Sequence, residues 1–278
     1  MVIELINNLR TAILWNTVMN TGCALIALTL LVLYLRDTRW VKCVLLCCLM
    51  MSELWGHDPL STRVMAAEPN YQFLTVTPKT ERELETRTLS EVCSLITDKD
   101  YRYCLVDQFK KPVDVITVCH ESTHMLDASL SKPGYQGIYL GSGHGIRLKI
   151  PNVRLDQITV PPHERGRVWD TYMVESRQWW SENVLYTLLE ANGYLNGAKV
   201  RAEKGWSNRS ETIRYGIELT SYYARAIEAV EKYDEAYDTA ALNEILHLLV
   251  AQWEVLTPDF KDWPLAYTLT PYGKGYTP

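Results

Sequence analysis

Residues 118–125 of this chain read Val-Cys-His-Glu-Ser-Thr-His-Met and contain the pattern H-E-x-x-H. Its histidines, His120 and His124, are four positions apart, and Glu121 directly follows the first of them. On an α-helix, residues i and i+4 share one face, so both imidazoles can reach one ion. Glu121 would then face the open side of that ion and act on a water there. The spacing is typical of a catalytic zinc site.

The residues around the motif predict a helix from about Val113 to Ser131. Pro112 suits the first helical turn, because its ring presets the backbone and its missing N–H is not needed there. Lys132-Pro133-Gly134 then ends the helix. The apolar residues that surround the histidines predict a buried helix: Val113, Ile116, Val118, Cys119, Met125 and Leu126. The competing interpretation is a helix that carries two histidines incidentally.

Composition narrows the class of protein. The chain has 278 residues, of which 47% are hydrophobic, enough for one sizeable domain and an additional segment. Its formal net charge is -5 and it contains no block of basic residues. These features argue against nucleic acid as the partner.

Two apolar stretches precede the metal motif and predict three regions in the chain. Residues 12–35 carry no charge and are long enough to span a bilayer, whereas the stretch at 43–51 is too short. We therefore assign residues 1–66 to a membrane anchor or signal region and residues 67–256 to the metal-binding domain. The Pro-, Tyr- and Gly-rich residues 257–278 form a tail that either drapes over the domain or is disordered.

The N-terminal region allows two interpretations. Either residues 12–35 anchor the chain in a membrane, or residues from about Leu35 form a secretory signal that is cut near Ala67. The order of basic residues, short apolar core and small residues favours export, with the metal-binding domain outside the cytoplasm. Cys93 and Cys104 could then form a disulfide, and buried free thiols are the alternative.

Several further elements follow from hydrophobic periodicity and turn residues. A helix is expected at 81–97, a strand at Tyr101–Val106, and one long helix or two broken near Ser181 at Val168–Val200. Amphipathic helices are expected at 210–232 and 239–256. The glycine-rich residues 136–150 predict a hairpin with its turn near Ser142-Gly143. This hairpin is either a ledge for substrate beside the metal or an ordinary cover of the core.

The third metal ligand has to come from elsewhere, because Asp127 and Leu130 replace the glycine and histidine of the short metzincin spacing. Glu190 lies within an apolar run, where an uncompensated carboxylate would be costly and a metal ion would compensate it. Glu175 has a similar apolar setting, but nearby arginines offer an ion-pair explanation. Glu190 is therefore the first choice and Glu175 the second.

With these residues the chain resembles gluzincin-type zinc metallopeptidases of bacteria. The resemblance covers about Val113 to Val200 and rests on the HESTH motif, the glycine-rich hairpin and the run from Leu189 to Gly197. It implies a zincin-like fold, peptidase activity, and Glu190 as the third ligand. The chain departs from the family pattern at Leu189, where an acid often stands, and at Gly193, where alanine is usual.

Five other residues are candidates for supporting roles. Tyr194 lies one turn beyond Glu190 and either donates to a developing oxyanion or packs against the metal helix. Asp127 either accepts from a ligand imidazole or caps locally. His144 and His163 lie in loops and are weaker donor candidates. His247 is expected to be a hydrogen-bonded core histidine.

Taken together, the sequence predicts an α+β, predominantly helical, zincin-like domain with a small sheet behind an N-terminal hydrophobic segment. We expect it to bind zinc through His120, His124 and Glu190 and to hydrolyse a protein or peptide substrate, with Glu121 as general base and Tyr194 as the oxyanion donor. One alternative is a catalytically inactive zinc-binding module for protein recognition. Another is a membrane-anchored structural protein.

Overall fold

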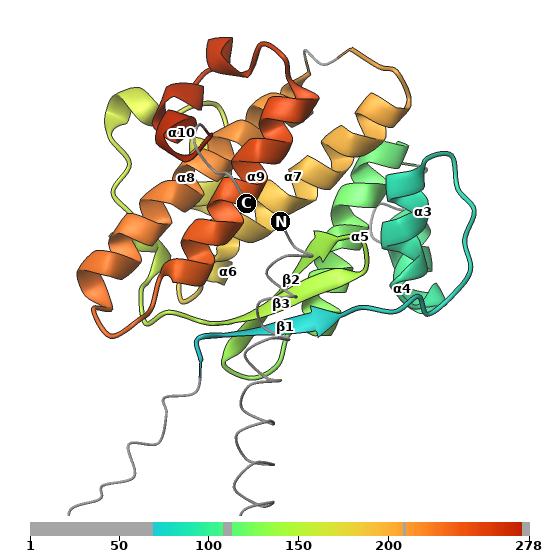
Figure 1. Cartoon of the computed structure of the whole chain (residues 1–278), viewed down its shortest axis with the longest axis horizontal. Coiled ribbons are helices and arrows are strands. Elements are labelled where there is room, and N and C mark those ends of the chain that lie inside the picture. The colour runs from blue at the N-terminus through green and yellow to red at the C-terminus, as the bar shows by residue number, and fades with distance from the viewer. Residues whose placement is uncertain (1–68, 108–112, 208–209, 274–278) are drawn as a thin grey trace, which may run out of the picture. The chain divides into compact units, whose positions relative to one another are not determined.

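The computed structural model describes residues 69–107, 113–207 and 210–273, and Figure 1 shows their arrangement. They form an α+β domain in which helices dominate and a small antiparallel sheet packs against them, as the sequence predicts. Both N-terminal apolar stretches and Pro112 lie outside the described residues. Among the described helices, none combines the length and hydrophobicity that crossing a membrane requires.

The sheet has the strand order β1-β3-β2 and is antiparallel throughout. β2 (Tyr135–Gly141) and β3 (His144–Lys149) form the predicted hairpin, and β1 (Tyr71–Thr75) adds to the far side of β3. The turn lies at Ser142 and Gly143, both of which have positive φ. Glycine tolerates this backbone readily, so the glycine-rich sequence is what permits the tight hairpin.

The predicted motif helix is α5 (Val115–Leu130), which crosses behind the sheet beside α7 (Tyr186–Glu203). Asp114 caps it, because its carboxylate accepts from the backbone N–H groups of Ile116 and Thr117 at 3.0 and 3.1 Å. Such a cap supplies partners that the first turn of a helix lacks. The helix ends before Gly134, whose φ is positive and whose turn leads into β2.

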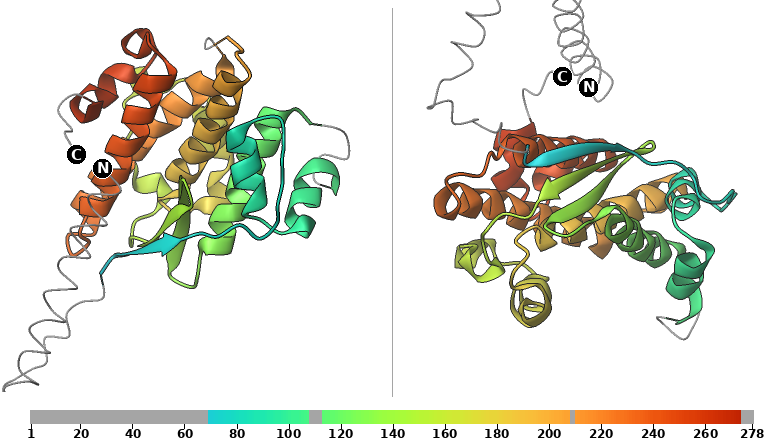
Figure 2. Two further views of the ribbon diagram at one scale, coloured as in Figure 1. Left: turned by 45° about the vertical axis from the view of Figure 1, so that its right-hand side comes forward. Right: turned by 90° about the horizontal axis from the view of Figure 1, so that it is seen from below.

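In the segment that precedes α5, the structure differs from two predictions, one for a long helix and one for a strand (Figure 2). The expected helix at 81–97 is shorter, because α3 (Arg87–Ser94) begins only after its capping residue Thr86. The expected strand at Tyr101–Val106 is wrong: these residues belong to α4 (Asp98–Arg102) and the π-helix η1 (Tyr103–Asp107). The hydroxyl of Thr97 accepts from the N–H of Asp100 and starts a helix there, so local capping overrides the alternating pattern.

The region from 168 to 200 is broken, as the second interpretation of the sequence expects. A π-helix, η4 (Trp169–Glu175), is followed by the short α6 (Arg177–Trp180), and the long α7 begins at Tyr186. The hydrogen bond from the N–H of Leu185 to the side chain of Asn183 lies in the connecting turn. This turn separates α6 from α7, and α7 packs extensively against α5.

The helices on the other side of α7 form the rest of the core. α8 (Glu211–Tyr233) and α9 (Ala240–Leu256) match the two predicted amphipathic helices, and Ser210 caps α8. The described part of the tail contains a short 3-10 helix, η5 (Phe260–Asp262), and α10 (Ala266–Gly273). Phe260 and Leu269 are buried in the main hydrophobic cluster and so anchor this part of the tail to the domain.

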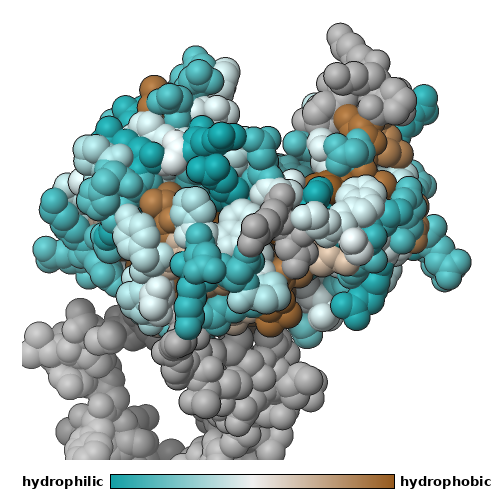
Figure 3. All heavy atoms as spheres, turned by 90° about the horizontal axis from the view of Figure 1, so that it is seen from above, coloured by the Kyte–Doolittle hydropathy of each residue, from teal (hydrophilic) through white to brown (hydrophobic). Residues whose placement is uncertain are grey.

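Three buried cysteines lie on α3, η1 and α5. Cys93, Cys104 and Cys119 are free thiols. The structure therefore contains the buried free thiols and not the disulfide between Cys93 and Cys104. The thiol of Cys93 lies 3.7 Å from the hydroxyl of Ser122 on α5. On the face of the molecule seen in Figure 3, hydrophilic residues cover most of the surface and hydrophobic ones form separate patches.

Candidate metal centre

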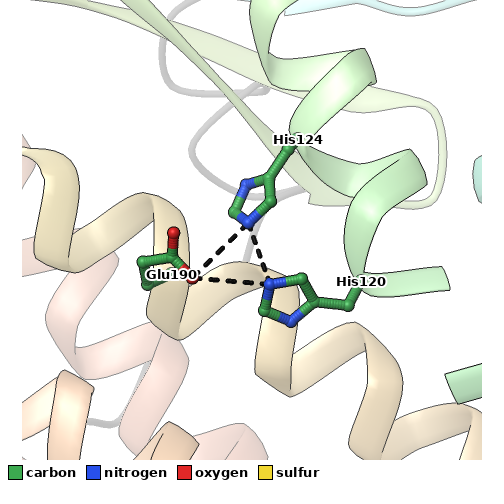
Figure 4. A group of neighbouring side chains, drawn as sticks. All are labelled: His120, His124 and Glu190. Carbon is green, nitrogen blue, oxygen red and sulfur yellow. Dashed lines mark hydrogen bonds and ion pairs between the residues drawn. The ribbon is translucent and has the colours of Figure 1, made fainter. Parts of the chain in front are cut away.

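Three side chains from two helices point toward one another and form the candidate centre (Figure 4). The Nε2 atoms of His120 and His124 lie 2.9 Å apart. The Oε2 atom of Glu190 lies 3.4 Å from the first and 3.5 Å from the second. The structure thus brings together three residues that could hold a metal ion, two from α5 and one from α7.

The triangle of donor atoms can be compared with the ligands of a tetrahedral zinc ion. Zinc binds imidazole nitrogen and carboxylate oxygen at roughly 2.0 to 2.2 Å, which places two ligand atoms about 3.3 to 3.5 Å apart. The two distances to Glu190, 3.4 and 3.5 Å, agree with this spacing. The distance of 2.9 Å between the two imidazoles is shorter. A few tenths of an ångström of ring movement would suffice, so the residues fit a metal ion.

The electrostatics of the metal-free group show how strongly the three side chains interact. Burial alone would lower the pKa of His124, but the charge and hydrogen bond of Glu190 outweigh burial and raise it to about 9. Burial acts against the ionised form of Glu190, yet the two imidazoles hold its pKa at about 2. The carboxylate is therefore ionised throughout the physiological range, which is the state in which it can bind a cation.

Glycine on α7 explains how the two helices come close enough to join these residues. A Cβ atom at Gly193 would lie 3.0 Å from Cε1 and 3.1 Å from Nδ1 of His120. One turn later, a Cβ at Gly197 would lie 3.0 Å from a methyl carbon of Ile116. Both distances are tighter than ordinary contacts, so the imidazole rests directly on the α7 backbone. The departure from the usual alanine at Gly193 therefore has a structural reason in this chain.

Three tyrosines surround Glu190, and sequence reasoning identified only one of them. The ring of Tyr194 packs edge-on against His120 with centroids 4.5 Å apart, and its hydroxyl lies 2.7 Å from that of Tyr172 on η4. Burial raises the pKa of Tyr194 to about 12. Tyr186, which forms a side-chain hydrogen bond with Glu190, precedes that residue by four positions. Tyr186 could have been found from this i, i+4 spacing, whereas no local signal connects Tyr172 to the centre.

Asp127 joins the hairpin to helix α5. Its Oδ1 accepts from the N–H of Tyr139 at 2.7 Å, and among the described residues its buried Oδ2 has no hydrogen-bond partner. The side-chain amide of Asn192 on α7 donates to the backbone carbonyl of Tyr139 on β2 at 3.0 Å. The edge of β2 is thus occupied by side chains of α5 and α7 at this position. A substrate strand cannot pair with β2 there, which argues against a substrate ledge along this edge.

The remaining predicted residues lie elsewhere. Glu175 is exposed at the end of η4 and is not part of the group. His144 begins β3, where it pairs with Thr75, and His163 is largely exposed beside Glu164. The Nδ1 atom of His247 lies 2.6 Å from the carbonyl oxygen of Tyr272, so the expected hydrogen bond is present, but the residue is half-buried and lies outside the core.

Comparison of the chain with protein-family models, curated proteins and solved structures finds no match. The resemblance to gluzincin-type peptidases therefore stays a prediction that the residues of the motif and of α7 carry.

The tight contact at Gly193 predicts a specific defect in metal binding. Gly193→Ala should displace the His120 ring and weaken affinity for a divalent metal ion by roughly 10- to 100-fold, the range typical of residues that orient ligands. Gly197→Ala is the comparison variant and should weaken affinity less, because its added methyl strains the same helix packing but meets Ile116 and no histidine. Affinity is measured by chelator competition. Equal affinities in the two variants would contradict the role of Gly193.

Asp127 predicts a pH dependence of stability. Burial raises its pKa from 3.8 to about 7, so the folded state binds a proton more tightly than the unfolded state does. Its contribution to stability is then complete below about pH 4 and is lost as the pH rises through 7, by roughly 2 to 4 kcal/mol. Asp127→Asn removes this dependence. Urea unfolding of both metal-free proteins between pH 4 and 8 measures the difference, and parallel pH profiles would refute it.

Proposed function

We propose that this protein is a zinc-dependent peptidase with a zincin-like active site. The observation that carries the proposal is the triangle formed by His120, His124 and Glu190, with sides of 2.9 to 3.5 Å. Catalytic zinc sites commonly have three protein ligands and an open position, and two histidines with a glutamate form one such set. The order of an H-E-x-x-H helix followed by a glutamate on a later helix also supports a zincin-like arrangement.

Zinc and ferrous iron can both use two histidines and a carboxylate. The position of Glu121 favours zinc and hydrolysis, since it places a second carboxylate directly after the first ligand. When bound, the ion supplies a Lewis acid that polarises a carbonyl group and lowers the pKa of water to about 7. We therefore assign hydrolysis of a peptide bond as the reaction.

Proton transfer and stabilisation of the oxyanion would be carried out by side chains of the protein. Glu121 is half-buried on α5 and would take a proton from the attacking water and deliver it to the leaving amine. Tyr194 is protonated at neutral pH, and burial moves its pKa further from neutrality, to about 12, so its hydroxyl can donate a hydrogen bond to the developing oxyanion. The hydroxyl of Tyr172, 2.7 Å away, can hold that of Tyr194 in place.

Metal analysis tests the ligands. The purified protein should contain one zinc ion, which His120→Ala, His124→Ala and Glu190→Ala should each remove, because each loses one of three donors. Glu175→Ala should retain it, since Glu175 lies outside the group. Elemental analysis gives the content. Loss of zinc from the Glu175 variant alone, or iron in place of zinc, would overturn the assignment.

The role of Glu121 is tested separately. Glu121→Gln should keep the zinc content of the wild type and lower turnover by roughly 100- to 10,000-fold, the range for removal of a general base. Cleavage of a peptide mixture, followed by mass spectrometry, measures it. Wild-type turnover in the variant would contradict the role. A zinc-loaded wild type that cleaves no peptide would instead favour the inactive zinc-binding module.

A further inference from the structure

Glu218 on α8 is only 2% exposed, and its carboxylate binds the loop that leads into η4. Its Oε2 accepts the backbone N–H of Arg167 at 3.1 Å, and its Oε1 accepts that of Val168 at 2.9 Å. Tyr222, one turn later on α8, donates its hydroxyl to Oε1 at 2.7 Å and accepts the N–H of Gly166 at 2.9 Å. Three successive backbone N–H groups of the loop are therefore bound by two side chains of one helix.

Gly166 allows the loop to come this close to the carboxylate. A Cβ atom at Gly166 would lie 2.3 Å from Cδ of Glu218, far closer than non-bonded carbon atoms approach. Gly166 is not among the glycines with positive φ, so the neighbouring carboxylate, and not the backbone conformation, requires a glycine here. A buried carboxylate is costly unless hydrogen bonds offset the loss of water, and the loop supplies such donors. The loop and the carboxylate are thus matched to each other.

A path of contacts continues from this loop to the candidate centre. The N–H of Val168 is held by Glu218, and the carbonyl of Val168 accepts the N–H of Tyr172 at 2.9 Å. The hydroxyl of Tyr172 lies 2.7 Å from that of Tyr194, whose ring packs edge-on against His120. The path therefore joins a carboxylate on α8 to Tyr194, the proposed oxyanion donor.

The position of η4 depends strongly on these bonds at its start. Met173 is the only one of its seven residues that is buried, while Trp169 and Tyr172 are partly buried against the core. Apolar packing therefore fixes η4 less firmly than the long helices beside it. Turns of π-helix are also rare and occur frequently at functional sites.

We infer that Glu218 is a positioning residue of the proposed peptidase, which orients the hydroxyl of Tyr194 through Val168 and Tyr172. The inference rests on the proposed function, because this orientation affects a reaction only if Tyr194 donates to the oxyanion. Glu218 acts through the backbone of the loop, so its loss displaces a donor without removing one. A displacement of about 1 Å in a group that acts on the transition state can lower the rate about 100-fold.

Fluorine NMR tests the orientation without turnover. The full chain is prepared with 3-fluorotyrosine at position 194, whose signal reports on the hydrogen bond of the adjacent hydroxyl. Tyr172→Phe defines the signal of a Tyr194 hydroxyl that has lost its partner. Glu218→Gln should move the signal in the same direction, because the NH2 group of the new amide faces a backbone N–H of the loop and cannot accept it.

A second variant and a matched control accompany this measurement. Gly166→Ala displaces the carboxylate from the side of the loop and should move the signal as Glu218→Gln does. The control is Glu164→Gln: Glu164 is also buried, at 4%, but binds the side chain of Arg225 at 2.7 and 2.9 Å. It should leave the signal in place. Thermal unfolding verifies that each variant is folded, and Gly166→Ala provides the test if Glu218→Gln is not.

A double-mutant cycle with Tyr194→Phe connects the orientation to the reaction. Glu218→Gln alone should lower kcat by roughly 10-fold, less than the roughly 100- to 1,000-fold expected when an oxyanion donor is removed. KM should change by less than about 2-fold, because the donor acts in the transition state. In the Tyr194→Phe background, Glu218→Gln should lower kcat by less than about 2-fold, since the hydroxyl that it positions is absent.

The possible results separate this inference from the proposed function. A fluorine signal that Glu218→Gln and Gly166→Ala leave unchanged, or that Glu164→Gln moves equally, would show that Glu218 does not position Tyr194. Equal effects of Glu218→Gln on kcat in both backgrounds would exclude action through the Tyr194 hydroxyl. A zinc-loaded wild type that cleaves no peptide would overturn the peptidase, and the fluorine signal would still decide whether Glu218 orients Tyr194.

Discussion

The close packing of α5 against α7 is the constraint on which the candidate centre depends. At Gly193 and Gly197 the α7 backbone is bare, and the His120 ring and the Ile116 side chain occupy the space that larger residues would fill. Only at this separation can a glutamate side chain on α7 reach two imidazoles on α5. The candidate group is therefore a product of helix packing, in which two glycines one turn apart act together with the i, i+4 spacing of the histidines.

Buried polar contacts hold the same pair of helices in register. The amide of Asn196 donates to the hydroxyl of Thr123, which itself donates to the Cys119 carbonyl one turn back on α5. Asn192 and Asp127 bind the two backbone groups of Tyr139 and so fix the hairpin to both helices. Buried polar groups without partners are costly, so a sliding of one helix would break several bonds at once. This arrangement keeps the donor atoms of the centre in a single geometry.

The sequence was informative where local chemistry determines the structure. The hairpin turn at Ser142-Gly143 and the i, i+4 histidine pair act within a few residues, and both appear as predicted. The caps at Asp114 and Ser210 are equally local, although they were not predicted. The strand expected at Tyr101–Val106 failed because an alternating pattern of six residues is weak beside a capped helix start at Thr97.

What the sequence could not give is contact between distant segments. Tyr172 lies in a π-helix and meets Tyr194 only because η4 folds back beside α7, and no periodicity encodes that approach. The same holds for the contact between Gly193 and His120, since a glycine inside a helix reveals a close neighbour without identifying it. Glu190 was found because an acid in an apolar run requires compensation, which is a local signal of a distant partner.

The balance of charge explains why a further buried acid is tolerated beside the centre. With the proposed divalent ion, Glu190 and Glu121 together neutralise its charge. A third ionised carboxylate at Asp127 would leave the interior with a net negative charge, at a high cost in a region of low dielectric. Burial raises the pKa of Asp127 to about 7, so that about half of this residue is neutral at pH 7. In its neutral form the carboxyl group accepts the N–H of Tyr139 through Oδ1 and positions the hairpin without adding a negative charge beside the candidate centre.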